Sequence, residues 1–397
     1  MRVMVALENR FIRTANGNIY STTVCDYDFW KRYLQVFEKV IVLARVATSP
    51  EISLNKLQAN GPGVEFFELP SFIGPWQYLK NRHRVESLVN AAVEQADAYI
   101  LRVPGTVATL LWKALMKKSI SYGVEVVGDP QASLGPGTVK SAIRPYIRFL
   151  MTRNQKLQCK EASAAAYVSE SYLQKDYPSC GWSTHYSSID LPADAFISKE
   201  ELESKRIGGQ LSNKPLRLCH IGSMSALYKS QDMLIRVVEI CRKRGLDVCL
   251  HLLGDGAYRS KFEKEARDHG VKDYIFFDGR LPPGQPVLKW LDQGDIFVLP
   301  SLTEGLPRSM IEAMARGLPC IGTNVGGIPE LLDEEYLVPP SNCHLLANKI
   351  CNYAENPNKL AKMSLENWQK AREYEHENLN KRRIDFYNHL KLNTEKY

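Results

Sequence analysis

The fold is decided by one stretch in the second half of the chain, Asp295-Ile-Phe-Val-Leu-Pro-Ser-Leu-Thr-Glu304-Gly-Leu-Pro-Arg-Ser-Met-Ile-Glu312-Ala-Met-Ala-Arg-Gly317. Its short apolar run, 296–299, is typical of a buried parallel strand. Pro307 fits the first turn of a following helix, and Gly317 fits the end of that helix. The stretch therefore predicts a strand, a loop and a helix, with Glu304 on the loop and Glu312 inside the helix.

A loop of this kind is a ligand-binding position, because open α/β sheets bind ligands at the carboxyl ends of their strands. The amino terminus of the helix offers free N–H groups and a positive dipole end, which suit a phosphate. Pro307 has no N–H, so the expected donors are Leu306, Arg308 and Ser309. The alternative is an ordinary helix with one first-turn Glu and one surface Glu.

The residues around the two glutamates favour the functional interpretation. The run from 300 to 330 contains Pro300-Ser301, Glu304-Gly305, Glu312-Ala313, Gly317-Leu-Pro319, Thr323-Asn-Val-Gly326-Gly327 and Pro329-Glu330. This run resembles the donor-site signature of the family-four retaining glycosyltransferases, which have the two-domain GT-B fold. The resemblance implies that Glu304, with Gly305, binds the sugar of a nucleotide-sugar donor. It also implies that Glu312 accepts hydrogen bonds from the ribose hydroxyls.

Strand-like runs alternate with helical patterns along the whole chain, which predicts parallel sheets with right-handed crossovers. The expected strands are Val3–Leu7, Val40–Ala44, Val64–Leu69, Ala98–Leu101, Val124–Val127, Ala164–Val168, Leu216–Ile221, Val248–Leu253, Tyr274–Phe277, Ile296–Leu299 and Cys320–Gly322. The expected helices include Tyr27–Glu38, Trp76–Gln95, Thr106–Lys117, Gln231–Arg244 and Arg259–His269. We therefore expect an α/β protein of GT-B architecture, with two doubly wound Rossmann-like domains facing across a cleft.

The polar stretch from Ser198 to Lys214 contains Gly208-Gly209, which is typical of a linker. It predicts an acceptor-binding domain over 1–200 and a nucleotide-sugar-binding domain over 201–375. The last segment is helical and highly charged. In the resembled family the terminal helix crosses back to the first domain, and we expect the same of residues 376–397.

Composition limits the class of protein. The chain has 397 residues, of which 44% are hydrophobic and 24% charged, as in a soluble globular protein with room for two domains. No apolar run is long enough for a transmembrane helix, and no signal peptide precedes the first strand, so we expect a cytoplasmic protein. Nine scattered cysteines without a C-x-x-C pair fit reduced thiols. The net charge of +7 suits an anionic membrane or a phosphorylated substrate. No nucleic-acid partner is expected.

Three further turns of the second domain follow predicted strands. Gly222 allows a close backbone approach and Lys229 can reach an anion. The resembled family usually carries a basic residue at the position of Ser223, so diphosphate binding is expected to depend on Lys229 and the helix that carries Glu312. Gly254 matches a family turn on the nucleotide side, although a tight strand-to-helix turn explains it equally well. Arg280 follows the strand that matches the family's base-binding strand.

The first domain gives weaker signals. Gly17 lies in a loop that faces the donor phosphates in the resembled fold. Arg102 and Asp129 end predicted strands and are candidates for the acceptor side, although Asp129-Pro130 is also a common turn sequence. Asp26 and Asp28 have the spacing of a metal-binding pair, but an Asp before a helix is more often a cap. No metal and no cofactor are expected.

Residues 140–160 contain six cations and no acid. Apolar residues recur there at helical spacing, at Ile143, Ile147, Leu150 and Leu157. This pattern is typical of a basic amphipathic helix on an anionic membrane, and equally of a core-facing helix with a solvated basic face.

The resemblance to the family-four glycosyltransferases implies a retaining glycosyltransferase that moves a sugar, most simply from a UDP-sugar, to a glycan or lipid-linked acceptor in polysaccharide or glycoconjugate biosynthesis. Glu304 and Lys229 are the expected catalytic residues. Two alternatives remain open. One is a nucleotide-sugar epimerase of the same fold, which needs acid and base residues near the sugar. The other is a catalytically silent nucleotide-sugar-binding protein, suggested by Ser223. A glycosidase is disfavoured, because no second suitably placed acid is evident.

Overall fold

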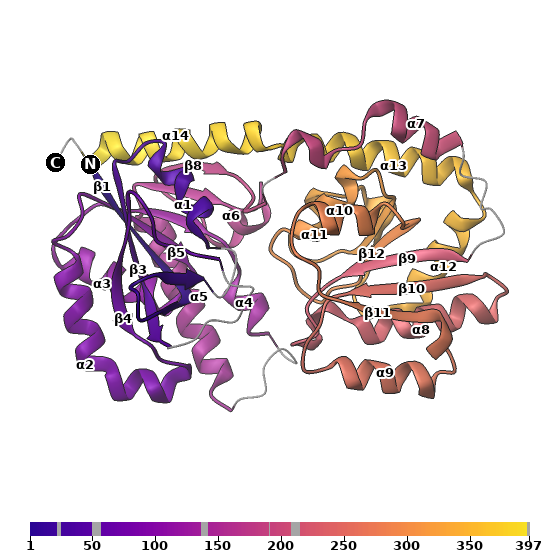
Figure 1. The fold of residues 1–397 in the computed structure, drawn as a ribbon, viewed down its shortest axis with the longest axis horizontal. Coiled ribbons are helices and arrows are strands. Elements are labelled where there is room, and N and C mark those ends of the chain that lie inside the picture. Colours follow the sequence, from indigo (N-terminus) through magenta and orange to yellow (C-terminus); the bar gives the residue numbers. More distant parts are fainter. Residues whose placement is uncertain (22–24, 50–56, 136–141, 190, 208–214, 395–397) are drawn as a thin grey trace. The chain divides into compact units, whose positions relative to one another are not determined.

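The computed structural model describes residues 1–21, 25–49, 57–135, 142–189, 191–207 and 215–394. The chain forms two compact units (Figure 1). Unit one comprises residues 1–131, 143–186 and 380–397, and unit two comprises residues 132–142 and 187–379. The predicted boundary at residue 200 lies inside unit two, and the last eighteen residues of the chain are assigned to unit one.

Unit one is built on an eight-stranded sheet. Its main path runs β4 (Val64–Pro70), β3 (Lys39–Thr48), β1 (Arg2–Arg13), β5 (Ala98–Val103), β6 (Gly123–Val126), β7 (Ala164–Tyr167) and β8 (Trp182–His185). All neighbours on this path are parallel, whereas β2 (Ile19–Ser21) pairs antiparallel with the end of β1. Because parallel strands need crossovers, helices cover both faces of the sheet.

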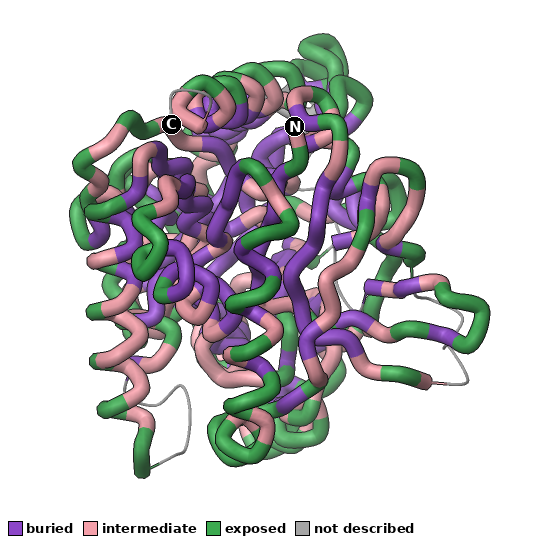
Figure 2. The backbone as a smooth tube through the Cα atoms, turned by 90° about the vertical axis from the view of Figure 1, so that its left-hand side faces the viewer, coloured by how far each residue is buried: buried purple, intermediate pink, exposed green. Residues whose placement is uncertain are grey.

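The two faces of this sheet bury different side chains. On one face Met4 and Ala6 pack with the helices α2 (Gly74–Ala92), α3 (Thr106–Lys117) and α5 (Arg144–Glu161). The short helices α4 (Pro130–Ser133) and α6 (Tyr172–Asp176) complete the connections. The helices α1 (Tyr27–Leu34) and α14 (His376–Thr394) supply Tyr33 and Tyr387, which donate to Glu125. Figure 2 shows that buried residues follow the strands while the outer surfaces of the helices are exposed.

Unit two contains a six-stranded sheet in which every pair is parallel. Its order is β11 (Ile275–Gly279), β10 (Val248–Leu253), β9 (Leu216–Ile221), β12 (Ile296–Leu299), β13 (Cys320–Thr323) and β14 (Leu337–Val338). Its helices are α7 (Lys199–Ile207), α8 (Gln231–Lys243), α9 (Arg259–Asp268), α10 (Gln285–Leu291), α11 (Arg308–Ala315), α12 (Cys343–Ala354) and α13 (Pro357–Ala371). The chain reverses strand order between β9 and β12, which creates a topological switch point there.

The predicted α/β architecture of two doubly wound domains is confirmed. Three strands were not predicted: β2, β8 and β14, which are two to four residues long. Segments this short give almost no periodic signal. Trp182 and Ser183 on the edge strand β8 are also exposed, so the strand lacks the apolar run that identifies a buried one.

The linker prediction for 198–214 is wrong over its first half, where α7 forms. Ser198 and Glu201 make a reciprocal capping box: the Glu201 N–H donates to Ser198 Oγ over 3.1 Å, and the Ser198 N–H donates to Glu201 Oε2 over 2.9 Å. Leu202 is fully buried. The predicted glycine pair, 208–209, lies outside the described residues.

A buried polar cluster joins α14 to unit one. Glu125 is buried, accepts hydrogen bonds from Tyr33, Tyr186 and Tyr387, and forms an ion pair with Arg102. Burial is the largest influence on Glu125 and opposes its ionisation, but the Arg102 guanidinium and the hydrogen bonds from Tyr186 and Tyr33 together outweigh it and lower the pKa of the carboxyl. Tyr387 belongs to α14, so this network fixes the terminal helix to the sheet that carries Glu125.

None of the helices in the described ranges is long and apolar enough to span a lipid bilayer.

Candidate functional site

The predicted site residues of unit two lie on loops that leave two adjacent strands. Lys229 ends the short 3-10 turn η2 (Leu227–Lys229), which follows β9. Glu304 lies on the loop between β12 and α11. Since β9 and β12 are parallel neighbours, their carboxyl ends meet at one sheet edge. The Leu302 N–H donates to the Tyr228 carbonyl over 2.7 Å, which joins the two loops directly.

At this edge Lys229 and Glu304 form an ion pair. Lys229 Nζ lies 2.6 Å from Glu304 Oε1, and the two side chains are only 13% and 9% exposed. Ser301 Oγ donates to the same carboxylate oxygen over 2.6 Å. Coulomb attraction between charges this close strengthens as water is excluded. A cation and a carboxylate are thus held side by side in a largely desolvated position.

The loop that carries Glu304 is held by its own backbone and by the loop after β13. Thr323 Oγ1 donates to the Ser301 carbonyl over 2.6 Å, and the Gly327 N–H donates to the Gly305 carbonyl over 2.7 Å. A Cβ atom on residue 326 would lie 1.9 Å from the Glu304 carbonyl oxygen, and that residue has a φ of +56°. Gly326 is therefore required for the close approach that positions Glu304.

A second pair of loops packs closely on the β9 side. A Cβ atom on residue 254 would lie 2.0 Å from the Gly222 carbonyl oxygen, and a Cβ atom on residue 256 would lie 2.3 Å from the Ser225 nitrogen. Both glycines have positive φ. The predicted strand-to-helix turn at Gly254 is present, and its glycines bring two backbones into contact at the carboxyl edge of the sheet.

Two polar side chains buried beneath the Gly222 turn are only partly satisfied. His220 Nδ1 donates to the Val298 carbonyl over 2.9 Å, and burial lowers the pKa of its imidazole to about 4. His220 Nε2 and Gln231 Oε1 are both buried and have no hydrogen-bond partner among the described residues. Gln231 Nε2 makes long contacts, 3.3–3.4 Å, to the carbonyls of Gly222 and Ser223. These neutral groups support the turn from below.

The helix α11 begins at Arg308, so Pro307 caps it rather than occupying its first turn. Leu306 and Pro307 are buried, and Ser309 follows Arg308 in the first turn, where backbone N–H groups have no acceptor within the helix. Burial raises the pKa of Glu312, which has no hydrogen-bond donor among the described residues, although Arg308 opposes the shift. Arg308 Nε is buried and has no hydrogen-bond partner among the described residues.

The remaining predicted donor residues of unit two are exposed. Ser223 Oγ accepts from the Ser225 N–H over 3.2 Å, so it stabilises its own turn and brings no charge to the edge. Arg280 is exposed on the loop after β11.

The candidate residues of unit one make contacts within that unit. Gly17, with a φ of +83°, is in the tight turn between β1 and β2, where its N–H donates to the Thr14 carbonyl over 3.0 Å. Arg102 is occupied by its ion pair with Glu125. Asp129 is buried and accepts from Tyr172, Tyr177 and the Gln131 N–H. Arg102 and Asp129 are thus already engaged in internal contacts.

The cap interpretation of Asp26 is confirmed: its carboxylate accepts from the Phe29 N–H over 3.0 Å at the start of α1. Asp28 pairs with Lys31 one turn further along. The two carboxylates therefore serve the helix.

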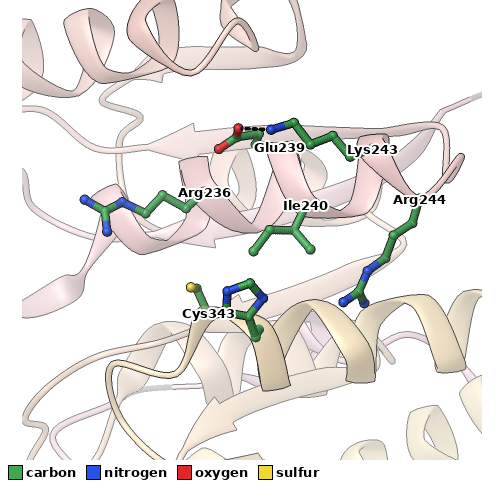
Figure 3. Close-up of a pocket in the computed structure, with 7 residues that line it drawn as sticks. Arg236, Glu239, Ile240, Lys243, Arg244 and Cys343 are labelled. Atoms are coloured by element: carbon green, nitrogen blue, oxygen red, sulfur yellow. Dashed lines mark hydrogen bonds and ion pairs between the residues drawn. The ribbon is translucent and has the colours of Figure 1, made fainter.

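A surface pocket of about 510 Å³ lies beside α8 and α12 (Figure 3). Its lining residues are Arg236, Glu239, Ile240, Lys243, Arg244, Cys343 and His344. Glu239 pairs with Lys243 over 2.6 Å, and Arg244 donates to Asn348. None of these lining residues belongs to the Lys229–Glu304 site.

Sequence reasoning did not assign roles to Ser301, Thr323, Gly326 and Gly327, which hold the Glu304 loop. The adjacent Gly326-Gly327 pair was the available signal, because consecutive glycines after a strand mark a close backbone approach. Their partner loop lies about twenty residues earlier, and nothing in the local sequence identifies it.

Comparison with known proteins was consistent with this geometry. Residues 215–356 match the family described as glycosyl transferases group 1. The chain is similar to the protein CapJ of Staphylococcus aureus, with 28% identity over 91% of this chain and 92% of that protein. It is also similar to the putative colanic acid biosynthesis glycosyltransferase WcaL of Escherichia coli, with 25% identity over 44% of this chain and 46% of WcaL.

Solved structures share the fold over the whole chain. Sucrose-phosphate synthase from Thermosynechococcus elongatus has a TM-score of 0.73 at 15% identity, covering 99% of this chain and 100% of that chain. HepE from Anabaena, solved with UDP and glucose, has a TM-score of 0.68 at 15% identity, covering 97% and 98%. The chain thus has the GT-B fold of two Rossmann-like units, and the match of its residues 215–356 to glycosyl transferases group 1 supports a glycosyltransferase.

Proposed function

We propose that this protein is a retaining glycosyltransferase that moves a sugar from a UDP-sugar to a glycan or lipid-linked acceptor. Unit two binds the donor in this proposal, and unit one binds the acceptor. Bacterial relatives named for colanic acid and amylovoran biosynthesis support a role in building polysaccharides. The UDP complexes of HepE support uracil as the base of the donor.

The observation that carries the proposal is the ion pair between Lys229 and Glu304 at the switch point of the unit-two sheet. A nucleotide sugar presents hydroxyl donors directly beside an anionic diphosphate. The adjacent carboxylate and ammonium match that order of groups, because a carboxylate accepts from hydroxyls and an ammonium donates to phosphate oxygens. Glu304 binds the sugar and Lys229 binds the diphosphate in this arrangement.

Three further groups complete the proposed donor site. Glu312 accepts hydrogen bonds from the ribose hydroxyls, since its carboxylate has no donor among the described residues. The first-turn N–H groups of α11 face an anion favourably through the helix dipole. Arg308 belongs to the same turn and has a buried, unpaired Nε, so it supplies the positive charge that Ser223 does not.

The chemistry that fits these residues is substitution on one face of the sugar. The bond between the anomeric carbon and the diphosphate oxygen breaks, and the acceptor hydroxyl oxygen forms its bond to that carbon from the same side. A phosphate oxygen takes the acceptor proton, and UDP leaves. Lys229, Arg308 and the helix N–H groups stabilise the charge that develops on the diphosphate, where preorganised donors contribute most to rate.

The test is incubation of the purified protein with a panel of UDP-sugars and with polysaccharide intermediates or their lipid-linked precursors. We expect release of UDP together with a glycosidic product whose anomeric configuration, read by NMR, is the same as in the donor. An inverted product contradicts the retaining mechanism. Isomerisation of the donor sugar without any transfer indicates an epimerase, and donor binding without turnover across the panel indicates a silent binding protein.

A further inference from the structure

The helices α2 and α5 of unit one begin alike. Each buries residues only in its later turns: Val85, Val89 and Ala92 on α2, and Gln155, Gln158 and Cys159 on α5. Their first turns project from the unit and expose large hydrophobic side chains at i, i+3 and i+6 spacing. These are the cap residue Ile73 with Trp76 and Leu79 at the start of α2, and the cap residue Ile143 with Tyr146 and Phe149 at the start of α5, all between 44% and 75% exposed.

This exposed face of α5 differs from the predicted stripe. Of the residues expected to line it, Leu157 packs against the core of unit one, and Ile147 and Leu150 are half-buried. The sequence predicted a single apolar row, whereas the helix has two. One row packs against unit one, and the other, Ile143, Tyr146 and Phe149, is exposed. A surface aromatic residue such as Phe149 gains nothing from the fold while it faces water.

Both projecting turns lie at the same edge of the unit. The helix α2 follows β4, and α5 follows β6 through α4. The strands β4 and β6 run parallel within one sheet and are separated by β3, β1 and β5, so their carboxyl ends share an edge, about 20 Å apart at the usual strand spacing. In Figure 1 both helices reach the lower edge of this unit.

The charge around these side chains has one sign. Residues 73–84 contain Lys80, Arg82 and Arg84, and residues 142–153 contain Arg144, Arg148 and Arg153, without an Asp or Glu in either segment. Arg82 pairs with Glu86, but no acid lies among the exposed hydrophobic residues. Exposed aromatic residues that are flanked in sequence by cations match the interface of an anionic bilayer, where rings lie among the headgroups and each Lys or Arg near the surface contributes about 1 kcal/mol.

We propose that the first turns of α2 and α5 form a two-point anchor that seats unit one on an anionic lipid surface. The proposal deepens the proposed function, because an enzyme with a lipid-linked acceptor meets its substrate at such a surface. Two anchors on one sheet edge also fix the orientation of the unit, since a single helix leaves it free to rotate. Each helix contributes side chains inserted below the headgroups and cations at their level.

Sedimentation of the full-length protein with vesicles tests the anchor. Phosphatidylcholine vesicles with roughly one third phosphatidylglycerol should bind it, with affinity that falls as salt rises, and pure phosphatidylcholine should bind it far less. Trp76→Ser and Phe149→Ser should each weaken binding by roughly 10-fold, and the double variant by roughly 100-fold. Leu392→Ser is the matched control, because it removes a 58% exposed apolar side chain on α14.

Each result decides the proposal. If the wild-type protein stays in the supernatant with anionic vesicles at low salt, the anchor is refuted. If Phe149→Ser abolishes binding while Trp76→Ser leaves it unchanged, α2 is not part of it. If Trp76→Ser instead removes self-association seen by sedimentation velocity, this edge is an interface between copies of the chain. All of these assays omit donor and acceptor, so they are independent of whether glycosyl transfer is found.

Discussion

Lys229 and Glu304 neutralise each other, which explains how two charged groups are tolerated at 13% and 9% exposure. Binding a nucleotide sugar in the proposed way gives both residues new partners at once. The ammonium gains phosphate oxygens and the carboxylate gains hydroxyl donors, while the contact between the two residues is kept or only lengthened. The pair therefore preorganises the site, since neither charge has to be desolvated when the donor arrives.

Glu304→Gln should reduce turnover by roughly 10²-fold or more, because it removes a charged contact to the reacting sugar in a desolvated site. Affinity for UDP itself should not fall, because UDP lacks the transferred sugar that Glu304 binds and because the substitution removes the counter-ion of Lys229. Steady-state kinetics and UDP titration separate these effects. Glu263→Gln, which alters a surface ion pair on α9, is the control. Normal turnover in Glu304→Gln removes this residue from the active site.

Glu312 should make UDP binding depend on pH. Burial raises the pKa of its carboxyl in the folded protein, so its ionisation costs stability: this cost grows as the pH rises from the ordinary Glu value to the raised pKa and stays constant above it. Glu312→Gln should therefore raise the melting temperature of the unliganded protein at neutral pH while weakening UDP binding by roughly 10-fold. Wild-type affinity should fall as the pH is lowered through the raised pKa, and the variant should lose that dependence. A variant that is less stable and binds UDP normally contradicts this role.

At the scale of elements, α14 connects the end of the chain to the sheet of unit one through Glu125. This carboxylate is surrounded by Tyr33, Tyr186 and Tyr387 and paired with Arg102, so every polar group of the cluster is satisfied from a different part of the chain. Arg102 therefore has a structural role. Its position at the end of a strand was equally compatible with a role on the acceptor side, so the sequence did not distinguish the two.

Glu125→Ala should lower the free energy of unfolding by about 3–5 kcal/mol, because it leaves the Arg102 guanidinium buried without its counter-ion. Chemical denaturation of the wild-type and variant proteins measures the difference. The double variant Glu125→Ala/Arg102→Met should recover part of the loss, since the uncompensated charge is then gone as well. A loss below about 1 kcal/mol in the single variant means that the cluster is solvated and does not fix α14.

The sequence predicted elements well where their periodicity was strong and long. The strands β9, β10 and β12 and the helix α3 have the predicted bounds, because each is a mostly apolar run or an amphipathic pattern that is followed by a clear Pro, Gly or polar residue. The helix α7 was missed although Ser198 and Glu201 form a capping box, because the charged composition of 199–206 outweighed that signal. The two apolar rows of α5 were predicted as a single stripe. The spacing of apolar residues identifies a helix, but it does not show which side of the helix packs against the unit.

The candidate site was predicted in outline for a different reason. The order of glutamates and glycines along 300–330 is local and dense, so the loop after β12 was evident from sequence. The ion pair between Lys229 and Glu304 spans 75 residues and depends on the adjacency of β9 and β12, which only the folded sheet provides. The same holds for Gly222 and Gly254, whose backbones meet across two loops.

At the scale of the whole molecule, positive charge at the diphosphate is expected to come from the protein alone. Lys229, Arg308 and the amino end of α11 supply cations and N–H donors of the kind that bind phosphate without a metal. Turnover should therefore persist in excess EDTA. The check is a rate measurement with and without chelator at fixed donor concentration. Loss of activity that a divalent ion restores contradicts a metal-independent site.

In the proposed function, unit two binds the diphosphate of a nucleotide sugar through Lys229, and calorimetric titration with UDP and with uridine tests this role. Wild-type protein should bind UDP far more tightly than uridine. Lys229→Ala should reduce UDP affinity by about 10- to 100-fold, the equivalent of a charge-assisted hydrogen bond of about 1.5–3 kcal/mol, and should leave uridine binding unchanged. Lys243→Ala, at an exposed lysine on α8, should behave as wild type. Equal losses for UDP and uridine, or none for either, contradict the claim.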